Sequence, residues 1–311
     1  MADQQSAEAE RDREHAAARG GVLKPLVAAL VATAALCAGN ATEAAAAPEP
    51  MRIVSLNLCV DSILVELVPH DRIAALTHYA RDPYRSTIAG LARQLPITYE
   101  TAEEVVALKP DLVLAGRHSA IATRNALRRV GIRFEVFDVP DTVAASLAQI
   151  RRIAALLGRE PRGELLVARI QSALQAARPL PNQAVLTAGV YQPGGLTAGP
   201  ATVTGELMAI AGLQNVAERY AVRSYGPLPL EKLISAPPQV LLVGETSNGA
   251  PMQAERIVRH RALRALQLQM RQEVFPARLL YCAGPTIIDA LDALVAARDD
   301  ARRTLASGEA R

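Results

Sequence analysis

Two stretches of the chain, far apart in sequence, repeat the same order of residue types. They are TAEEVVALKPDLVLAG at residues 101–116 and PLEKLISAPPQVLLVG at residues 229–244. In each, a glutamate opens a short amphipathic run, a proline ends that run, and an apolar run closes on a glycine. Proline cannot continue a helix, and an unbroken apolar run is typical of a strand buried on both faces of a parallel sheet. Each copy therefore predicts a helix followed by a buried strand, and two copies predict two α/β lobes built alike.

Other apolar runs extend the same pattern. Further strands are expected at residues 52–56, 72–76, 132–137, 184–191 and 279–282. Helices are expected at residues 62–67, 120–130, 204–211, 253–271 and 287–305. Residues 80–99 are interpreted as a loop-rich segment, which leaves the first lobe with four strands. Residues 142–178 carry a helical pattern with a kink or break marked by Gly158 and Pro161, and they predict a stiff connector between the lobes.

Composition and the absence of common motifs exclude several classes of function. The 311 residues are 50% hydrophobic, which suffices for two α/β domains, and the net charge of only +3 gives no sign of a nucleic-acid surface. Trp is absent and aromatic residues make up 3% of the chain, so no base-stacking platform is indicated. The turn after the first strand reads SLNLCVD instead of GxGxxG, and neither a P-loop nor a GxSxG turn occurs. We therefore expect no enzymatic activity and no catalytic residues. Cys59 with His78 is the alternative, as a thiol nucleophile, but nothing in the sequence places the two in contact.

The N-terminal segment indicates export. Lys24 precedes an apolar run at residues 25–38, which is too short to span a bilayer comfortably, and small residues follow. Residues 1–47 are interpreted as a signal peptide with an N-terminal extension, and translation starting at Val22 would explain the long polar leader. An uncleaved membrane anchor is the alternative. Leu36 directly before Cys37 argues against a lipid anchor.

Two cysteines remain beyond the signal segment. Cys59 and Cys282 are suited to forming one disulfide in an oxidising compartment. The sequence does not fix that pairing, and the favoured interpretation is two unpaired small residues near strand ends.

Six stretches together resemble a known family. They are RIVSLNLCVD, DRIAALTHYARDP, AEEVVALKPDLVLAG, RRVGIRFEVFDVPDTVAASLAQI, GLTAGPATVTGELMAIAGLQNVA and GPLPLEKLISAPPQVLLVG. Their order and spacing resemble the class III (Fe/B12-type) periplasmic substrate-binding proteins of ABC importers. The resemblance implies two Rossmann-like lobes joined by a long rigid helix, with the ligand in a cleft between them. The implied parts are an N-terminal lobe at 51–140, a connecting helix at 141–179 and a C-terminal lobe at 180–306.

The resemblance also implies a role for the two repeated glutamates. In the family, one acidic residue on each lobe docks onto a basic pocket of the permease dimer, and Glu103 and Glu231 occupy the matching positions. Charge complementarity of this kind fixes register and encounter rate. The alternative is that both glutamates merely stabilise helix N-termini, an effect of about 0.3–1 kcal/mol each.

Candidate ligand-binding residues follow from a general rule. Ligands of open α/β sheets bind at the carboxyl ends of the strands. In the first lobe this rule selects Cys59, Tyr79, Tyr99, Arg117 and His118. In the second lobe it selects Tyr191, Gln192, Tyr225 and Tyr281. Tyr side chains offer apolar area with a polar tip, and Arg117 is suited to pairing a carboxylate in bidentate fashion.

Several ligands fit such a set. A ferric siderophore is the first choice, because the lack of Trp and the glycine at position 116 depart from the cobalamin-binding pattern. Cobalamin remains an alternative, as does haem with Tyr79, Tyr191, Tyr225 or Tyr281 as iron ligand. A direct metal-ion binder would use His78, His118, Asp61 and Asp82, but the other lobe offers only His260. We expect no resident cofactor or metal, and a monomer that carries a small molecule to an ABC permease dimer.

Overall fold

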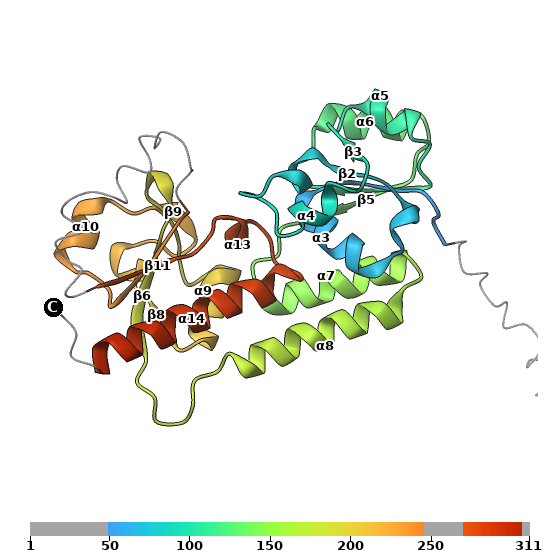
Figure 1. Cartoon of the computed structure of the whole chain (residues 1–311). Coiled ribbons are helices and arrows are strands. Elements are labelled where there is room, and N and C mark those ends of the chain that lie inside the picture. Colours follow the sequence, from blue (N-terminus) through green and yellow to red (C-terminus); the bar gives the residue numbers. More distant parts are fainter. Residues whose placement is uncertain (1–48, 246–269, 307–311) are drawn as a thin grey trace, which may run out of the picture. The chain divides into compact units, whose positions relative to one another are not determined.

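The computed structural model describes residues 49–245 and 270–306, and these form two parallel sheets with helices packed on them (Figure 1). The first lobe contains a five-stranded sheet in the order β3-β2-β1-β4-β5. Its strands are β1 (Ile53–Leu56), β2 (Ile73–Thr77), β3 (Ile97–Thr98), β4 (Leu112–Gly116) and β5 (Phe134–Phe137). Its helices are α3 (Leu58–Leu67), η1 (His70–Arg72), η2 (His78–Arg81), α4 (Ala89–Ala92), α5 (Ala102–Ala107) and α6 (Ile121–Arg129).

The second lobe contains a four-stranded sheet in the order β11-β10-β6-β8, and a separate antiparallel pair β7-β9. Its strands are β6 (Leu186–Tyr191), β7 (Leu196–Ala198), β8 (Leu213–Asn215), β9 (Tyr225–Pro227), β10 (Val240–Val243) and β11 (Arg271–Val274). Its helices are η3 (Pro193–Gly195), α9 (Val203–Ile210), η4 (Ala217–Tyr220), α10 (Leu230–Ser235), α13 (Arg278–Tyr281) and α14 (Thr286–Ala306). All pairings within both large sheets are parallel, as the α/β prediction requires.

The repeated sequence unit forms the same substructure in both lobes. Helix α5 leads into the fully buried strand β4, and helix α10 leads into the fully buried strand β10. Thr101 caps α5, because its hydroxyl accepts a hydrogen bond from the Glu104 N–H at 3.2 Å. Pro229 occupies the equivalent position before α10 and makes no side-chain cap. The repeat therefore encodes the helix–strand unit, while the capping chemistry differs between its copies.

Two helices, not one, make up the connection between the sheets. Helix α7 (Val143–Leu156) and helix α8 (Glu160–Ala176) lie side by side (Figure 1). The turn between them uses Gly158 at φ +64°, which is the break that its sequence predicted. A Cβ atom on Gly163 would lie 2.5 Å from that of Ala154, so the two helices approach too closely for any other residue there. The long helix α8 then leads toward the second sheet.

Three expectations about secondary structure were wrong. Residues 279–282 form no strand, because Arg278–Tyr281 make one helical turn that buries Leu279 and Leu280. The strand beside β10 is instead β11, whose sequence RQEV lacks the apolar run by which buried strands are recognised. The segment 80–99 includes the short strand β3, so the first sheet has five strands. The helix expected at 253–271 lies outside the described residues except at its end, where Arg271 begins β11.

A disulfide bond joins the two lobes in addition to the connecting helices. Cys59, at the start of α3, forms a disulfide with Cys282, and their Cα atoms are 5.1 Å apart. The expectation that these cysteines are unpaired was therefore wrong, because 222 intervening residues fold back to bring them together. Nearby, the Gly284 N–H donates to the Ser146 hydroxyl at 2.8 Å, and the Val143 N–H at the start of α7 donates to the Glu206 carboxylate on α9 at 2.7 Å. Among the described helices, none is both long and apolar enough to cross a bilayer.

Candidate functional site

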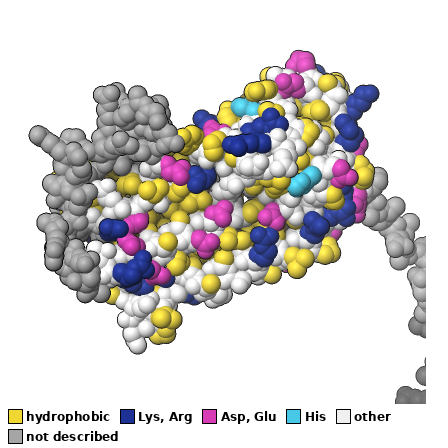
Figure 2. Space-filling view, in the orientation of Figure 1, with side chains coloured by type: hydrophobic (Ala, Val, Ile, Leu, Met, Phe, Trp, Pro, Cys, Tyr) yellow, Lys and Arg dark blue, Asp and Glu magenta, His cyan; other side chains and the backbone are white. Residues whose placement is uncertain are grey.

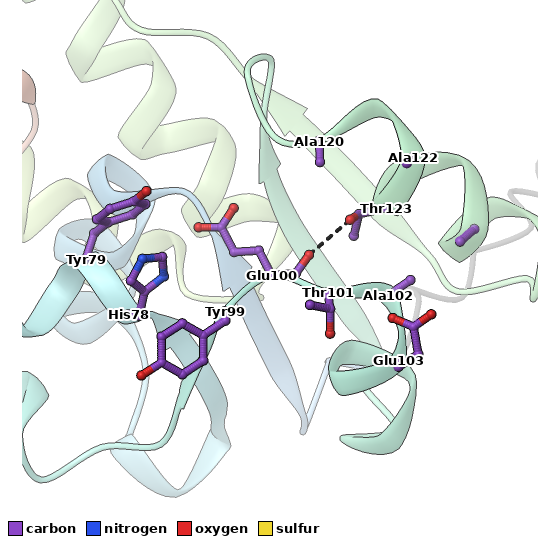
Figure 3. A pocket seen from close by; sticks show the side chains of 11 residues that line it. His78, Tyr79, Tyr99, Glu100, Thr101, Ala102, Glu103, Ala120, Ala122 and Thr123 are labelled. Atoms are coloured by element: carbon purple, nitrogen blue, oxygen red, sulfur yellow. Dashed lines mark hydrogen bonds between the residues drawn. The ribbon is translucent and has the colours of Figure 1, made fainter.

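A cavity of about 540 Å³ opens at the carboxyl ends of β2 and β3 in the first lobe (Figure 3). It continues over the start of α5 and along one side of α6. Its lining residues are His78, Tyr79, Tyr99, Glu100, Thr101, Ala102, Glu103, Ala120, Ala122, Thr123 and Ala126. The described part of the second lobe contributes none of these residues, so this cavity belongs to one lobe and does not span the expected interlobe cleft.

Three aromatic rings form one wall of the cavity. The His78 ring lies against Tyr79, with ring centroids 3.9 Å apart, and is stacked on Tyr99 with centroids 4.9 Å apart. The guanidinium of Arg85 lies over the Tyr79 ring, 5.0 Å from its centroid. The Nδ1 atom of His78 is buried and has no hydrogen-bond partner among the described residues. The wall therefore combines flat apolar surface with one buried imidazole nitrogen that lacks a hydrogen-bond partner among the described residues.

The Tyr99 backbone is held by a carboxylate below it. One oxygen of Glu104 accepts hydrogen bonds from the Thr98 hydroxyl at 2.7 Å and from the Tyr99 N–H at 2.8 Å. The hydrogen bond from Thr98 is the main cause that lowers the pKa of the Glu104 carboxyl. Glu104 is therefore charged at neutral pH, and it ties the end of β3 to the first turn of α5.

Glu100 forms the floor between the aromatic wall and α6. Its backbone is left-handed, with φ +68°, and its carbonyl accepts a hydrogen bond from the Thr123 hydroxyl at 3.0 Å (Figure 3). In the same view its carboxyl group points toward His78. Partial burial raises the pKa of the Glu100 carboxyl, against the opposing influence of the His78 imidazole.

The charged side chains of Asp, Glu, Lys or Arg type that line the cavity are all acidic. The lining residues in the described part of the chain include the two carboxylates of Glu100 and Glu103 and no Lys or Arg. Elsewhere acidic and basic side chains are interspersed, as the face drawn in Figure 2 shows. The cavity can therefore stack on a flat ligand and accept hydrogen bonds from it, but it offers no cation to a ligand carboxylate.

The sequence-derived candidates in the first lobe divide into two groups. Tyr79 and Tyr99 line the cavity, as do their neighbours His78 and Glu103. Arg117 instead forms a bidentate ion pair with Asp138 at the end of β5, so its guanidinium is already occupied by a protein carboxylate. His118 is exposed at the end of β4 and does not line this cavity. Cys59 is taken up by the disulfide.

The second-lobe candidates also differ among themselves. Tyr191 is only 1% exposed and packs in an apolar cluster with Val216 and Leu228. Gln192 is buried as well and donates to the Phe275 carbonyl at 2.9 Å. Tyr225 and Tyr281 are each 47% exposed, and the Tyr225 hydroxyl lies 3.4 Å from the Leu280 carbonyl. Among the tyrosines of the second lobe, these two are exposed, whereas Tyr191 and Tyr220 are buried.

Several site residues escaped the sequence analysis. Glu100 and Thr123 were missed because the bend that brings them together follows a two-residue strand read as loop. Asp61 belongs to a turn that the strand-end rule selects, and it is also a candidate metal ligand from the sequence, but the structure buries it completely. In residues 49–245 and 270–306, no three His, Cys, Asp or Glu side chains gather as a metal site would require, and His260 lies outside that part.

Comparison with known proteins matches this architecture. Residues 53–267 match the family model described as periplasmic binding protein. A cobalamin-binding protein of Halobacterium salinarum is 27% identical over 215 residues, which cover 68% of this chain and 58% of that protein. The periplasmic heme-binding protein RhuT from Roseiflexus sp. RS-1 has 25% identity and a TM-score of 0.60, with 79% and 98% of the two chains covered.

A third similar protein extends the range of ligands. The periplasmic vitamin B12 binding protein BtuF of Vibrio cholerae has 18% identity and a TM-score of 0.58, with 82% of this chain and 99% of that chain covered. At that identity the likeness concerns the fold alone. The family match covers well over half of the chain, and the structure contains the two parallel sheets that the resemblance implies. The chain therefore belongs to the periplasmic binding protein family.

Proposed function

We propose that this chain is the exported binding component of an ABC importer, without enzymatic activity, and that its ligand is a cobalamin. The carrying observation is the cavity lining in the described first lobe, which combines stacked aromatic rings with two carboxylates and no cation. A corrin ring bears many peripheral amides, which can donate hydrogen bonds to carboxylates, and its broad face can pack against aromatic rings. The curated relative from Halobacterium salinarum carries the name of a cobalamin-binding protein, which supports the same choice.

The acidic lining of the cavity is unfavourable for a ferric siderophore, the ligand that the sequence favoured. Many ferric siderophore complexes are anionic, and a like charge close to Glu100 and Glu103 is unfavourable. Arg85 lies at the aromatic wall, but it already interacts with Asp82 at 3.3 Å. A ferric siderophore is therefore the weaker proposal for this cavity.

Haem is the second candidate, and one specific observation favours it. The Nδ1 atom of His78 is buried without a partner in the described residues and lies beside Tyr79 and Tyr99, and both His and Tyr are known haem-iron ligands. The haem propionates would lack a cation among the described lining residues. We therefore place haem behind cobalamin.

Ligand choice is tested by binding on the mature, oxidised protein. Cyanocobalamin, hemin and a ferric hydroxamate are titrated separately and followed by calorimetry and by ligand absorbance. We expect saturable cobalamin binding, and a thermal shift that corresponds to about 2.7 kcal/mol at 100 times the dissociation constant. A red-shifted Soret band with hemin alone would favour haem, whereas binding of only the ferric hydroxamate would restore the siderophore interpretation.

Permease docking is proposed at Glu103 and Glu231. Each is an exposed second residue of a six-residue helix, in α5 and α10, and each helix leads into a buried strand of its own sheet. Their equivalent positions in the two lobes suit a two-fold permease dimer. Glu103 also lines the cavity, so docking and ligand binding meet at this residue.

Export to the periplasm completes the proposal. A disulfide such as Cys59–Cys282 persists in an oxidising compartment. The expected signal segment at 1–47 lies outside the described residues. Mass spectrometry of the protein recovered from the periplasm would locate the mature N-terminus, and a full-length chain retained in the membrane would contradict cleavage.

A further inference from the structure

A buried carboxyl group connects helix α3 to the wall of the cavity. Asp61 lies in the first turn of α3 and is completely buried. One of its oxygens accepts hydrogen bonds from the Thr77 N–H at 3.2 Å and from the Thr77 hydroxyl at 2.8 Å. The other oxygen makes no hydrogen bond of ordinary geometry within the described residues, although the nearby Ser55 hydroxyl opposes the effect of burial on the pKa of this carboxyl group. A buried polar atom without a partner is costly, so Asp61 is a poor choice for simple core filling.

Thr77 is the point at which β2 turns into the cavity wall. It is the last residue of β2, and η2 begins at the next residue, His78. The His78 ring is the middle member of the aromatic wall, between Tyr79 and Tyr99. Both polar groups of Thr77 that face Asp61 are fixed by one carboxyl group, so the direction in which the chain leaves β2 depends on that group.

The other end of this connection is also fixed. The Asn57 side chain caps α3 by accepting hydrogen bonds from the Cys59 N–H at 2.8 Å and the Val60 N–H at 3.2 Å. Cys59 is further bonded to Cys282 of the second lobe. The first turn of α3 is therefore held at three points, and Asp61 projects from this turn to Thr77.

We propose that Asp61 is a positioning residue for the ligand: through its two hydrogen bonds to Thr77 it sets the orientation of the His78, Tyr79 and Tyr99 rings. This inference rests on the proposed ligand-binding function of the cavity. Burial raises the pKa of the Asp61 carboxyl to about 8, so the neutral acid predominates at neutral pH. Asparagine has nearly the same shape as that neutral acid and keeps an oxygen for Thr77, whereas leucine keeps only the volume.

The matched control lies in the second lobe, at the amino ends of its strands. Gln239 precedes β10, and its side-chain oxygen accepts hydrogen bonds from the Thr187 N–H at 2.9 Å and the Thr187 hydroxyl at 3.3 Å. It therefore makes the same kind of double contact as Asp61, but at the amino ends of β6 and β10, away from the cavity. Gln239→Leu removes that contact without touching the aromatic wall.

The test compares Asp61→Asn, Asp61→Leu and Gln239→Leu in the full mature protein. Cyanocobalamin affinity is measured by calorimetry, and the ring arrangement is followed without ligand by tyrosine near-UV circular dichroism and the His78 imidazole NMR signals. We expect Asp61→Leu to bind about tenfold more weakly, with altered ring signals, which corresponds to about 1.4 kcal/mol. Asp61→Asn and Gln239→Leu should keep both the affinity and the ring signals.

The outcomes separate this inference from the proposed function. If the parent protein does not bind cobalamin, the function fails, while the ring signals of Asp61→Leu still test positioning. Unchanged ring signals and affinity in a folded Asp61→Leu variant would overturn the inference. Equal losses in Asp61→Leu and Gln239→Leu would also overturn it, because they would indicate a general effect of lost stability.

Discussion

His78 and Tyr99 are stacked, with ring centroids 4.9 Å apart and ring planes inclined by 28°. They come from the ends of two neighbouring strands, β2 and β3, so the pairing of those strands places one ring on the other. Tyr99 remains 64% exposed, although its N–H is held by Glu104. The structure thus presents a ring whose backbone is fixed and whose face is open to a ligand.

Tyr99→Ala should weaken ligand binding about five- to tenfold, because it removes the open face of this stack. The control is Tyr84→Ala, which removes a tyrosine that is 49% exposed and does not line the cavity. Calorimetric titration of both variants with cyanocobalamin measures the difference. Equal affinities in the two variants would argue against a ligand at this wall.

The contribution of Asp61 to the stability of the protein should fall as pH rises from about 4 to about 8. The Asp61 carboxyl has its pKa raised from 3.8 to about 8 by burial, so the folded protein retains a proton that the unfolded chain releases. This contribution is fully present below pH 3.8 and is lost as pH rises through that window, by at most about 1.4 kcal/mol per pH unit.

Urea unfolding of Asp61→Asn isolates this contribution. The variant has no titrating group at position 61, so the difference in unfolding free energy between it and the parent should shift in its favour between pH 5 and pH 8. A difference that stays constant across this range would show that Asp61 ionises normally.

Removing the disulfide should destabilise the protein by about 2–5 kcal/mol, because the bond closes a very long loop in the unfolded chain. The double variant Cys59→Ser/Cys282→Ser tests this in urea unfolding. A reducing agent should lower the stability of the parent and leave the double variant unchanged. If the reductant has no effect on the parent, the two sulfurs are not bonded in solution.

Charge reversal at Glu231 should reduce transport and leave ligand affinity unchanged, since this residue does not line the cavity. Uptake of labelled cobalamin by cells carrying Glu231→Arg measures the first effect, and calorimetry measures the second. Glu103→Arg should reduce uptake too, but it also alters the cavity wall. Normal uptake by both single variants and by their combination would rule out docking through these glutamates.

The sequence predicted the interior of the fold better than its edges. Strands β4 and β10 are unbroken apolar runs because both their faces are covered, so hydrophobicity alone identifies them. Strand β11 reads RQEV, with exposed and half-buried residues, and hydrophobicity does not reveal it. The turn Arg278–Tyr281 carries the apolar pair Leu279-Leu280, and a short apolar run of this kind predicts a strand as readily as a helix.

The strand-end rule selected residues that the structure places in different surroundings. Residues that follow a strand end, such as Tyr79 and Tyr99, do reach the cavity. Tyr191 is itself the last residue of its strand, and the alternation of side chains turns it into the apolar cluster instead. Glu100 depends on a left-handed backbone that a non-glycine sequence does not announce.

The bond between Cys59 and Cys282 also orders events in time. The first sulfur emerges early during synthesis, and the second emerges only when nearly all of the folded part of the chain has followed. Until then the N-terminal turn of α3 has no covalent partner. The disulfide can therefore form only after almost the whole chain has been made, and a chain that ends before position 282 cannot form it.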